Sequence, residues 1–294
     1  MTEVRSMPSQ ATSPQATSPQ ATSPQATPPQ ATGFRAEADA LRALLVTLKD
    51  TDWERPTLFK RWTVNDIVRH LHDGDLMAAA SVAGPEVFAA FRAEREALID
   101  GGMTRVRAAQ YRLGDLAGPR LLACWHAQVA ALCARLSALP PETRLKWAGP
   151  DMGLRMFTTA RQMETWAHGQ AIYDLMGVPR EATDRLRDIA EIGVRTYGWT
   201  FANRGLPAPG AAPHVRLTAP SGAVWEWNNP TPENSVAGDA LSFCQVVTQT
   251  RNVADTGLTV RGEPARIWMS LAQCFAGPPE DPPPPGARVA ETKS

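Results

Sequence analysis

The sequence has few cysteines and no surplus of charge, and both absences narrow what the protein can be. Its four cysteines, Cys124, Cys133, Cys244 and Cys274, show no CxxC spacing and lie in apolar stretches with a helical pattern. We therefore expect buried free thiols rather than a disulfide framework. Lys plus Arg and Asp plus Glu number 30 each, so no basic excess predicts binding to nucleic acid or to an anionic membrane surface.

Long apolar runs are also absent. No stretch approaches the roughly 20 apolar residues that a membrane-spanning helix needs, and the N-terminus lacks a basic region followed by an apolar one. We therefore expect a cytoplasmic protein. Hydrophobic residues nevertheless make up 43% of the 294 residues, which is ample material for a globular core.

Both ends of the chain have a composition that does not favour folding. The motif QATSP repeats within residues 1–33, and a five-residue period of Gln, Ala, Thr, Ser and Pro offers no apolar face to bury. Residues 278–294 are rich in proline. We predict a disordered tail at each end.

Residues 34–205 have the periodicity of several helices. Thr63 is an N-cap residue with Asp66 three positions later, which predicts a helix running toward Val82. Pro85 opens a further expected helix, and the stretch RLLACWHAQVAALCARLSAL is strongly amphipathic. We expect two more helices over residues 157–176 and 183–203.

Residues 206–277 have a different character. LPAPGAAP is a linker by composition, and HVRLTA and AVWEW read as a hairpin. A helix near residues 238–249, a strand at GLTVRG and a helix at PARIWMSLAQCFA complete a small α+β unit. A unit of this size is near the lower limit for independent stability, so we expect it to pack on the helical part.

Two segments carry residue types that can bind a metal ion. Glu164 and His168 are four apart on one expected helix, so both side chains leave the same face. Arg161 lies on that face one turn earlier. The pair could hold one ion together, although such a pair is also common on solvated helix surfaces.

The segment WTVNDIVRHLHDGD supplies a possible partner. Asp66, His70 and Asp73 share one side of their helix, whereas His72 lies roughly 200° from His70 around the helix axis. The centre of the apolar stripe falls between the two histidines. Periodicity therefore does not decide which of them faces the interior, and both could lie at the solvated edge.

These motifs carry a family resemblance. WTVNDIVRHL and ARQMETWAHGQ, about a hundred residues apart, resemble the mycothiol-dependent maleylpyruvate isomerase family of DinB-like metalloproteins. GDALSFCQVVTQTR and LTVRGEPARIWMSLAQ resemble the C-terminal domain that accompanies this fold. The resemblance covers residues 36–277 and is greatest to an actinobacterial branch grouped by metal binding. It implies a mainly α protein, with a DinB-like four-helix bundle followed by a small α+β domain.

The resemblance also implies a metal site and a thiol cosubstrate. The family binds zinc through a W-x3-D-x3-H and an E-x3-H motif, which here correspond to His70, Glu164 and His168. Asp66 and His72 then become outer residues that support the ligands. Three N/O ligands leave an open position on zinc, which is typical of a catalytic site. A thiol at that position, mycothiol in the family, is ionised by the cation.

In maleylpyruvate isomerase the thiolate adds to a cis double bond, the bond rotates, and elimination returns the trans isomer. An arginine of the second domain binds the diacid substrate, and Arg251 is the best positional match. Arg161 is a second candidate, and Arg251 could equally be an ordinary surface residue at a helix end.

One position departs from the family pattern. Relatives carry an acidic residue three positions after the second histidine, where this chain has Ala171. Losing such an acceptor weakens metal binding, although Asp174 one turn later could replace it. The resemblance thus predicts a zinc- and thiol-dependent isomerase or transferase for a small substrate. A metal-binding module without catalysis and an Fe(II) enzyme remain alternatives. The two other histidines, His126 and His214, we interpret as structural, and the sequence does not predict an oligomeric state.

Overall fold

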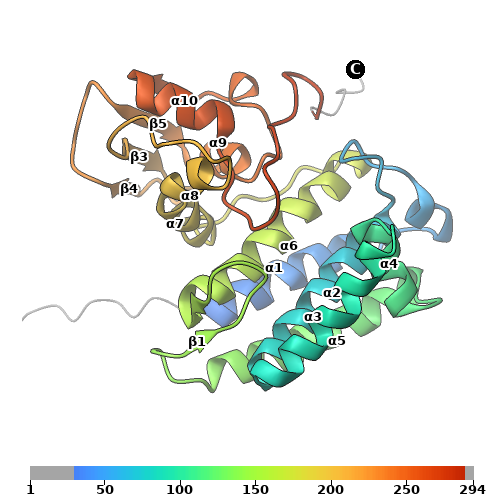
Figure 1. Ribbon diagram of the computed structural model, residues 1–294. Helices are drawn as coiled ribbons and strands as arrows, with labels where there is room; N and C mark the ends of the chain where they lie inside the picture. The colour runs from blue at the N-terminus through green and yellow to red at the C-terminus, as the bar shows by residue number, and fades with distance from the viewer. Residues whose placement is uncertain (1–29, 289–294) are drawn as a thin grey trace, which may run out of the picture.

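The structure, a computed structural model, describes residues 30–288. They form a helical bundle and a smaller α+β unit that packs against it (Figure 1). The mainly α architecture with a small sheet, as expected from the sequence, is confirmed. No helix of the described region is long and apolar enough to cross a membrane. The three QATSP repeats, at residues 10–24, lie outside the described residues.

Four long helices form the bundle. They are α1 (Gln30–Leu45), α2 (Val64–Ala83), α5 (Gly118–Ser137) and α6 (Leu154–Met176). Helix α1 packs on α5 and α6, and α2 packs on α5 and α6. Their apolar stripes meet in one core that includes Phe34, Leu71, Trp125 and Phe157. The apolar stripes predicted from the sequence therefore form the core of the bundle.

Local signals fix where α2 begins. Thr63 accepts a hydrogen bond from the backbone N–H of Asp66, and the Asp66 carboxylate accepts one from the N–H of Thr63. This reciprocal capping box satisfies two backbone donors at the helix start. The predicted helix start at Thr63 is confirmed.

Shorter elements surround the bundle. A 3-10 turn, η1 (Asp50–Glu54), precedes α2. Helices α3 (Pro85–Asp100) and α4 (Arg105–Leu113) pack on the outer side of α2. Strands β1 (Arg144–Leu145) and β2 (Met152–Gly153) pair before α6. Sequence reasoning missed α4, because RVRAAQYRL has few apolar residues and buries only two alanines.

The second unit combines helices with a four-stranded sheet. Helices α7 (Leu186–Arg195), α8 (Tyr197–Ala202), α9 (Ala240–Val247) and α10 (Glu263–Leu271) pack with it, and η2 (Val253–Asp255) is a short turn. The strand order is β4–β3–β5–β6, with β3 parallel to β5 and the other pairs antiparallel. The strands are β3 (His214–Thr218), β4 (Val224–Trp227), β5 (Ser235–Asp239) and β6 (Thr259–Arg261).

The expected hairpin and the β6 strand are confirmed, whereas β5 was not expected. Its sequence SVAGD has one large apolar residue, Val236. The strand forms because its backbone pairs with β3 on one side and with β6 on the other. The single helix expected over residues 183–203 is two helices that meet at Thr196. Thr196 donates its hydroxyl to backbone carbonyls of the preceding turn.

Helix α6 belongs to both units. Its residues Ala160, Met163 and Trp166 join a second core with Phe243 and Trp268. Helices α7 and α8 belong to this second core too, so the division of the hydrophobic core lies earlier in the chain than the expected boundary at residue 205. The three functional candidates on α2 and α6 therefore sit beside the surface where the two units meet.

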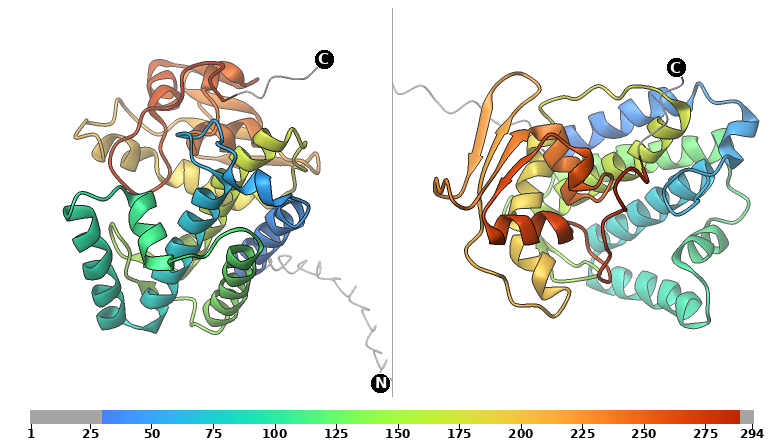
Figure 2. Two further views of the ribbon diagram at one scale, coloured as in Figure 1. Left: turned by 90° about the vertical axis from the view of Figure 1, so that its right-hand side faces the viewer. Right: turned by 90° about the horizontal axis from the view of Figure 1, so that it is seen from above.

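Both expected tail boundaries differ from the structure. Helix α1 begins at Gln30, and Ala31 is buried, so residues 30–33 are helical. The C-terminal segment, residues 278–288, is also ordered and crosses between the two units, as both views of Figure 2 show. Asn252 donates to the Pro283 carbonyl, and Asp255 accepts from the Gly286 N–H. The proline-rich composition predicted disorder, but hydrogen bonds to backbone groups of the segment hold it in place.

Candidate metal centre and pocket

The bundle brings three possible metal ligands together from two helices. His70 lies in the first half of α2, and Glu164 and His168 lie one turn apart on α6. Glu164 Oε2 is 3.5 Å from His70 Nε2 and 3.3 Å from His168 Nε2. One ligand atom from each residue lies within 4.8 Å of the others. Among the described residues no other group of His, Cys, Asp and Glu has this arrangement.

The protonation states of this cluster suit a cation. The pKa of His70 is lowered to about 4, chiefly by burial and then by the neighbouring His168, whereas Glu164 acts to raise it. Burial by itself raises the pKa of Glu164, but hydrogen bonds with His168 and His70 outweigh it and hold the pKa well below its usual range. His70 is thus a neutral imidazole beside a carboxylate, the forms in which both bind metals.

Aromatic rings hold the two histidines in place. Trp62 stacks on His168 with ring centroids 5.8 Å apart, and Phe59 meets His168 edge to face at 5.0 Å. Both come from the loop before α2, where Lys60 and Arg61 have left-handed backbone conformations with φ of 50° and 60°. This tight loop turns the aromatic side chains toward the cluster. The sequence motif contained Trp62 but gave no reason to expect its partner Phe59.

A cavity of about 150 Å³ opens at the three ligands. Its wall comes from the loop before α2, from α6, from the end of α9 and from the segment after α10. Apolar side chains of Trp62, Met163 and Phe275 line it together with charged ones. The second unit thus closes a site that the bundle alone would leave open. Residues lining the cavity from outside the bundle include Arg251, Phe275, Pro278, Glu280 and Arg288.

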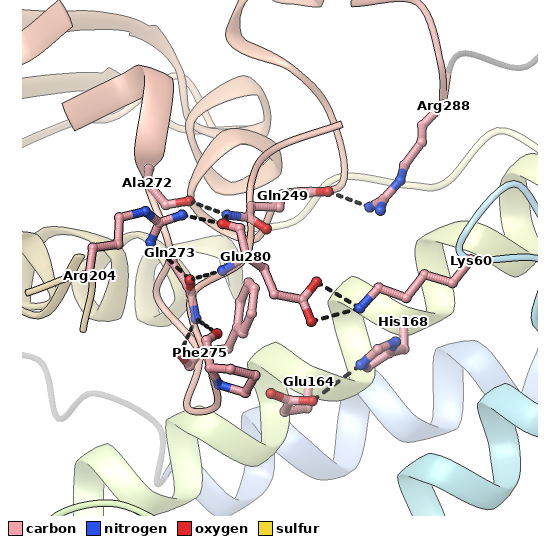
Figure 3. Close-up of polar contacts among 11 residues, drawn as sticks. Lys60, Glu164, His168, Arg204, Gln249, Ala272, Gln273, Phe275, Glu280 and Arg288 are labelled. Carbon is pink, nitrogen blue, oxygen red and sulfur yellow. Dashed lines mark hydrogen bonds and ion pairs between the residues drawn. The ribbon is translucent and has the colours of Figure 1, made fainter. Parts of the chain in front are cut away.

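Two ion pairs in this wall join the bundle to the rest of the chain. Arg251 donates to both carboxylate oxygens of Asp174 on α6, at 2.7 and 2.8 Å. Lys60 donates to both carboxylate oxygens of Glu280, at 2.6 and 2.7 Å. Figure 3 shows the side chains of Lys60 and Glu280 pointing toward one another. The pair lies on the same side of α6 as Glu164 and His168. The cavity therefore carries paired charges of both signs.

Arg161, expected as a second anion-binding candidate, lies outside this cavity. Its side chain is buried and donates to Asp75 at 2.8 Å. The same Asp75 accepts from the indole N–H of Trp125. A Cβ on Gly74 would lie 2.8 Å from the Arg161 Nη2 atom, so glycine makes room for the guanidinium. Arg161 therefore joins α6 to α2 within the bundle, and the expectation that it meets a substrate is corrected.

The other expected supporting residues also have different partners. Asp66 caps α2 and lies 3.7 Å from Arg69. His72 is buried on another side of α2, where burial lowers its pKa. Asp174 accepts from Arg251 and Gln170, and in the described part of the chain it makes no hydrogen bond with His168. Asp174 thus does not take the place left empty by Ala171, which lines the cavity.

The two other histidines lie beside carboxylates, and three of the four cysteines are buried. His126 lies 2.5 Å from Asp39, and His214 lies 3.7 Å from Glu226. All four cysteines are free thiols, and Cys133, Cys244 and Cys274 are buried as expected. Cys124 is exposed, because it lies on the outer face of α5.

The fold and the site define a class, a helical-bundle protein with a candidate metal centre that is closed by an α+β unit. Residues 34–173 match the mycothiol maleylpyruvate isomerase N-terminal domain. The chain is 37% identical, over 249 residues, to an uncharacterized protein found in two strains of Mycobacterium tuberculosis, H37Rv and CDC 1551, with 83% of this chain and 94% of that protein covered. The chain belongs to one family with that protein, and its residues 34–173 belong to the maleylpyruvate isomerase N-terminal domain family, so the resemblance seen in the sequence is confirmed.

Two solved structures are more distant. One is a mycothiol-dependent maleylpyruvate isomerase, with 16% identity, a TM-score of 0.49, and coverage of 78% of this chain and 90% of that one. The other is a mutant of a mycothiol-dependent maleylpyruvate isomerase, with 16% identity, a TM-score of 0.46 and coverage of 74% and 86%.

Proposed function

We propose that the protein is a divalent-metal-dependent enzyme that uses a low-molecular-weight thiol of the mycothiol type to isomerise a small, carboxylate-bearing substrate or to transfer the thiol to it. One observation carries this proposal: the cluster of His70, Glu164 and His168 lines the same cavity as Arg251. A site for a cation and a site for an anion thus lie within one small space. Membership of the family supports the choice of thiol.

The donor set fits a catalytic zinc ion. Two imidazoles and one carboxylate supply three ligands, which leaves one position of a tetrahedral ion free. When bound, the ion lowers the pKa of a thiol that reaches this position, so that the thiolate forms near neutral pH. The same set also suits Fe(II), and the metal content of the purified protein distinguishes the two.

The chain's own residues would position the reactants. His70 and His168 are held by Trp62 and Phe59, whose rings also keep water from that side of the cavity. Arg251 is oriented by its two bonds to Asp174 and still faces the cavity. A guanidinium has several N–H donors, so its free edge can donate hydrogen bonds to a further carboxylate.

The isomerisation would conserve all atoms. The thiolate sulfur adds to one carbon of a cis double bond conjugated to a carbonyl, and the electron pair moves to the carbonyl oxygen. Rotation about the resulting single bond follows. The carbonyl electron pair then returns, the C–S bond breaks, and the trans alkene and the thiolate are released. Thiol transfer differs only in its last step, where the adduct takes up a proton and leaves with its C–S bond intact.

A titration with mycothiol tests the proposal. Protein loaded with one zinc ion per chain should bind the thiol and release about one proton near neutral pH, measured by calorimetry in buffers of different ionisation enthalpy. The His168→Ala variant, which lacks a ligand, should bind no thiol. Arg251→Ala should bind the thiol normally and lose affinity for a carboxylate substrate by about 10- to 100-fold, since a charge-assisted hydrogen bond contributes about 1.5–3 kcal/mol.

The alternatives predict other results. A protein that holds one ion per chain but binds no small thiol would be a metal-binding module, in keeping with the small Ala171 in place of an acidic residue. A purified protein that contains iron and reacts with oxygen would favour the Fe(II) enzyme. Either result would contradict the proposed thiol chemistry.

A further inference from the structure

The pair formed by Lys60 and Glu280 differs from every other ion pair in the cavity wall. Both oxygens of the Glu280 carboxylate accept from the Lys60 ammonium, and the pair lies on the side of the cavity where Glu164 and His168 are drawn (Figure 3). Both residues line the cavity. A cation that holds a carboxylate there can hold another carboxylate in the same way.

The two ion pairs of the cavity wall have different strengths. The side chains of Arg251 and Asp174 are 12% and 11% exposed, and the bond is bidentate. Those of Lys60 and Glu280 are 42% and 34% exposed. Exposed lysine–carboxylate pairs contribute little to stability because water and salt screen them. The Lys60–Glu280 pair is therefore the one that a ligand can displace.

The backbone of Glu280 stays fixed when its side chain leaves Lys60. Gln273 Oε1 accepts the Glu280 N–H at 2.9 Å, and Gln249 Nε2 donates to its carbonyl at 2.7 Å. Arg204 donates to the same carbonyl. Both glutamines are buried. Only the rotamers of Glu280 need to change, which costs far less than releasing the whole segment.

We propose that Lys60 is a second carboxylate-binding residue of the cavity, besides Arg251, and that Glu280 occupies it in the absence of substrate. A substrate carboxylate then binds by displacing the Glu280 side chain. This inference rests on the proposed carboxylate-bearing substrate and adds a second residue that would hold it.

Titration of metal-loaded protein with succinate tests this inference. Glu280→Gln should bind succinate about two- to fivefold more tightly, because an exposed pair no longer competes. Lys60→Gln should bind it about two- to fivefold more weakly, because the bond lost is to an exposed, screened ammonium and the Glu280 carboxylate is left unpaired beside the ligand. Asp281→Asn is the matched control, because it removes the same charge from the neighbouring, 92% exposed side chain. It should bind succinate like the unmodified protein.

The double variant separates competition from a general effect of charge. In a Lys60→Gln background, Glu280→Gln should bring no further gain, because there is no cation left to compete for. A gain that persists there, an equal gain in Asp281→Asn, or no gain in Glu280→Gln would each overturn the inference. Metal content and mycothiol binding measured on the same samples report on the proposed function independently, so the two failures are distinguishable.

Discussion

The imidazole rings of His70 and His168 lie edge to face with their centroids 4.4 Å apart, although they come from different helices. Glu164 lies between them and faces both Nε2 atoms. Two imidazoles at this distance repel each other when both are charged, and burial already favours the neutral form of His70. A cation among the three residues would be coordinated by the lone pairs of the two imidazoles and the carboxylate. This is the physical basis for the metal site proposed above.

The first prediction separates the two histidines of the α2 motif. We expect about one divalent ion per chain in the unmodified protein, and close to none in His70→Ala or His168→Ala, because each removes one of three ligands. His72→Gln should keep its metal, since His72 is buried on another side of α2. Elemental analysis of protein purified without added metal makes the comparison, with circular dichroism to verify folding. Metal loss in the His72 variant alone would mean that the wrong histidine has been chosen.

The second prediction concerns Arg161. Arg161→Met leaves the carboxylate of Asp75 buried without its cation, and we expect the free energy of unfolding to fall by about 3–5 kcal/mol. Arg155→Met is the control on the same helix, because the Arg155 side chain is 60% exposed and lies 3.8 Å from Asp188. It should change stability by less than about 1 kcal/mol. Urea unfolding measures both, and equal effects would show that the Arg161–Asp75 pair does not hold the bundle together.

The third prediction concerns the C-terminal segment. A chain that ends at Gly277 loses the Glu280 backbone groups that bond to the buried side chains of Gln249 and Gln273. Each unsatisfied buried group costs about 1–3 kcal/mol. We expect the melting temperature to fall by at least about 4 °C. A chain that ends at Arg288 should melt like the full-length protein, and identical melting of the two shortened chains would show that residues 278–288 add nothing to the fold.

The fourth prediction concerns thiol reactivity. Only Cys124 is exposed, whereas burial raises the pKa of Cys133 to about 12 and raises those of Cys244 and Cys274 as well. The thiolate is the reactive form. A disulfide reagent should therefore label one thiol per native chain and four after unfolding. Cys124→Ser should react with none in the native state, and rapid labelling of a second thiol would contradict the buried positions.

Much of the architecture is encoded locally. The capping box at Thr63, the proline that opens α3 and the apolar stripe of α5 depend on residues a few positions apart, so the sequence determined these helices and their order. It also determined that Glu164 and His168 share one helix face, because their spacing matches a helical turn. Helix α4 has an N-cap at Thr104 but few apolar residues, and β5 has one large apolar residue, so both depend on neighbouring elements that pack or pair with them.

Other features depend on contacts between distant segments. The apolar stripe of α2 lies between His70 and His72, so the residues alone left that choice open, and only the packing of α2 against α6 turns His70 toward Glu164. The buried bond to Asp75 removed Arg161 from the list of anion-binding residues. Lys60 and Glu280 meet because buried glutamines hold the backbone of a proline-rich segment. Such backbone hydrogen bonds cannot be predicted from amino-acid composition. The sequence by itself thus determined the helices and the ligand types, whereas the tertiary structure decided which side chains face the cavity, because that depends on how separate elements pack.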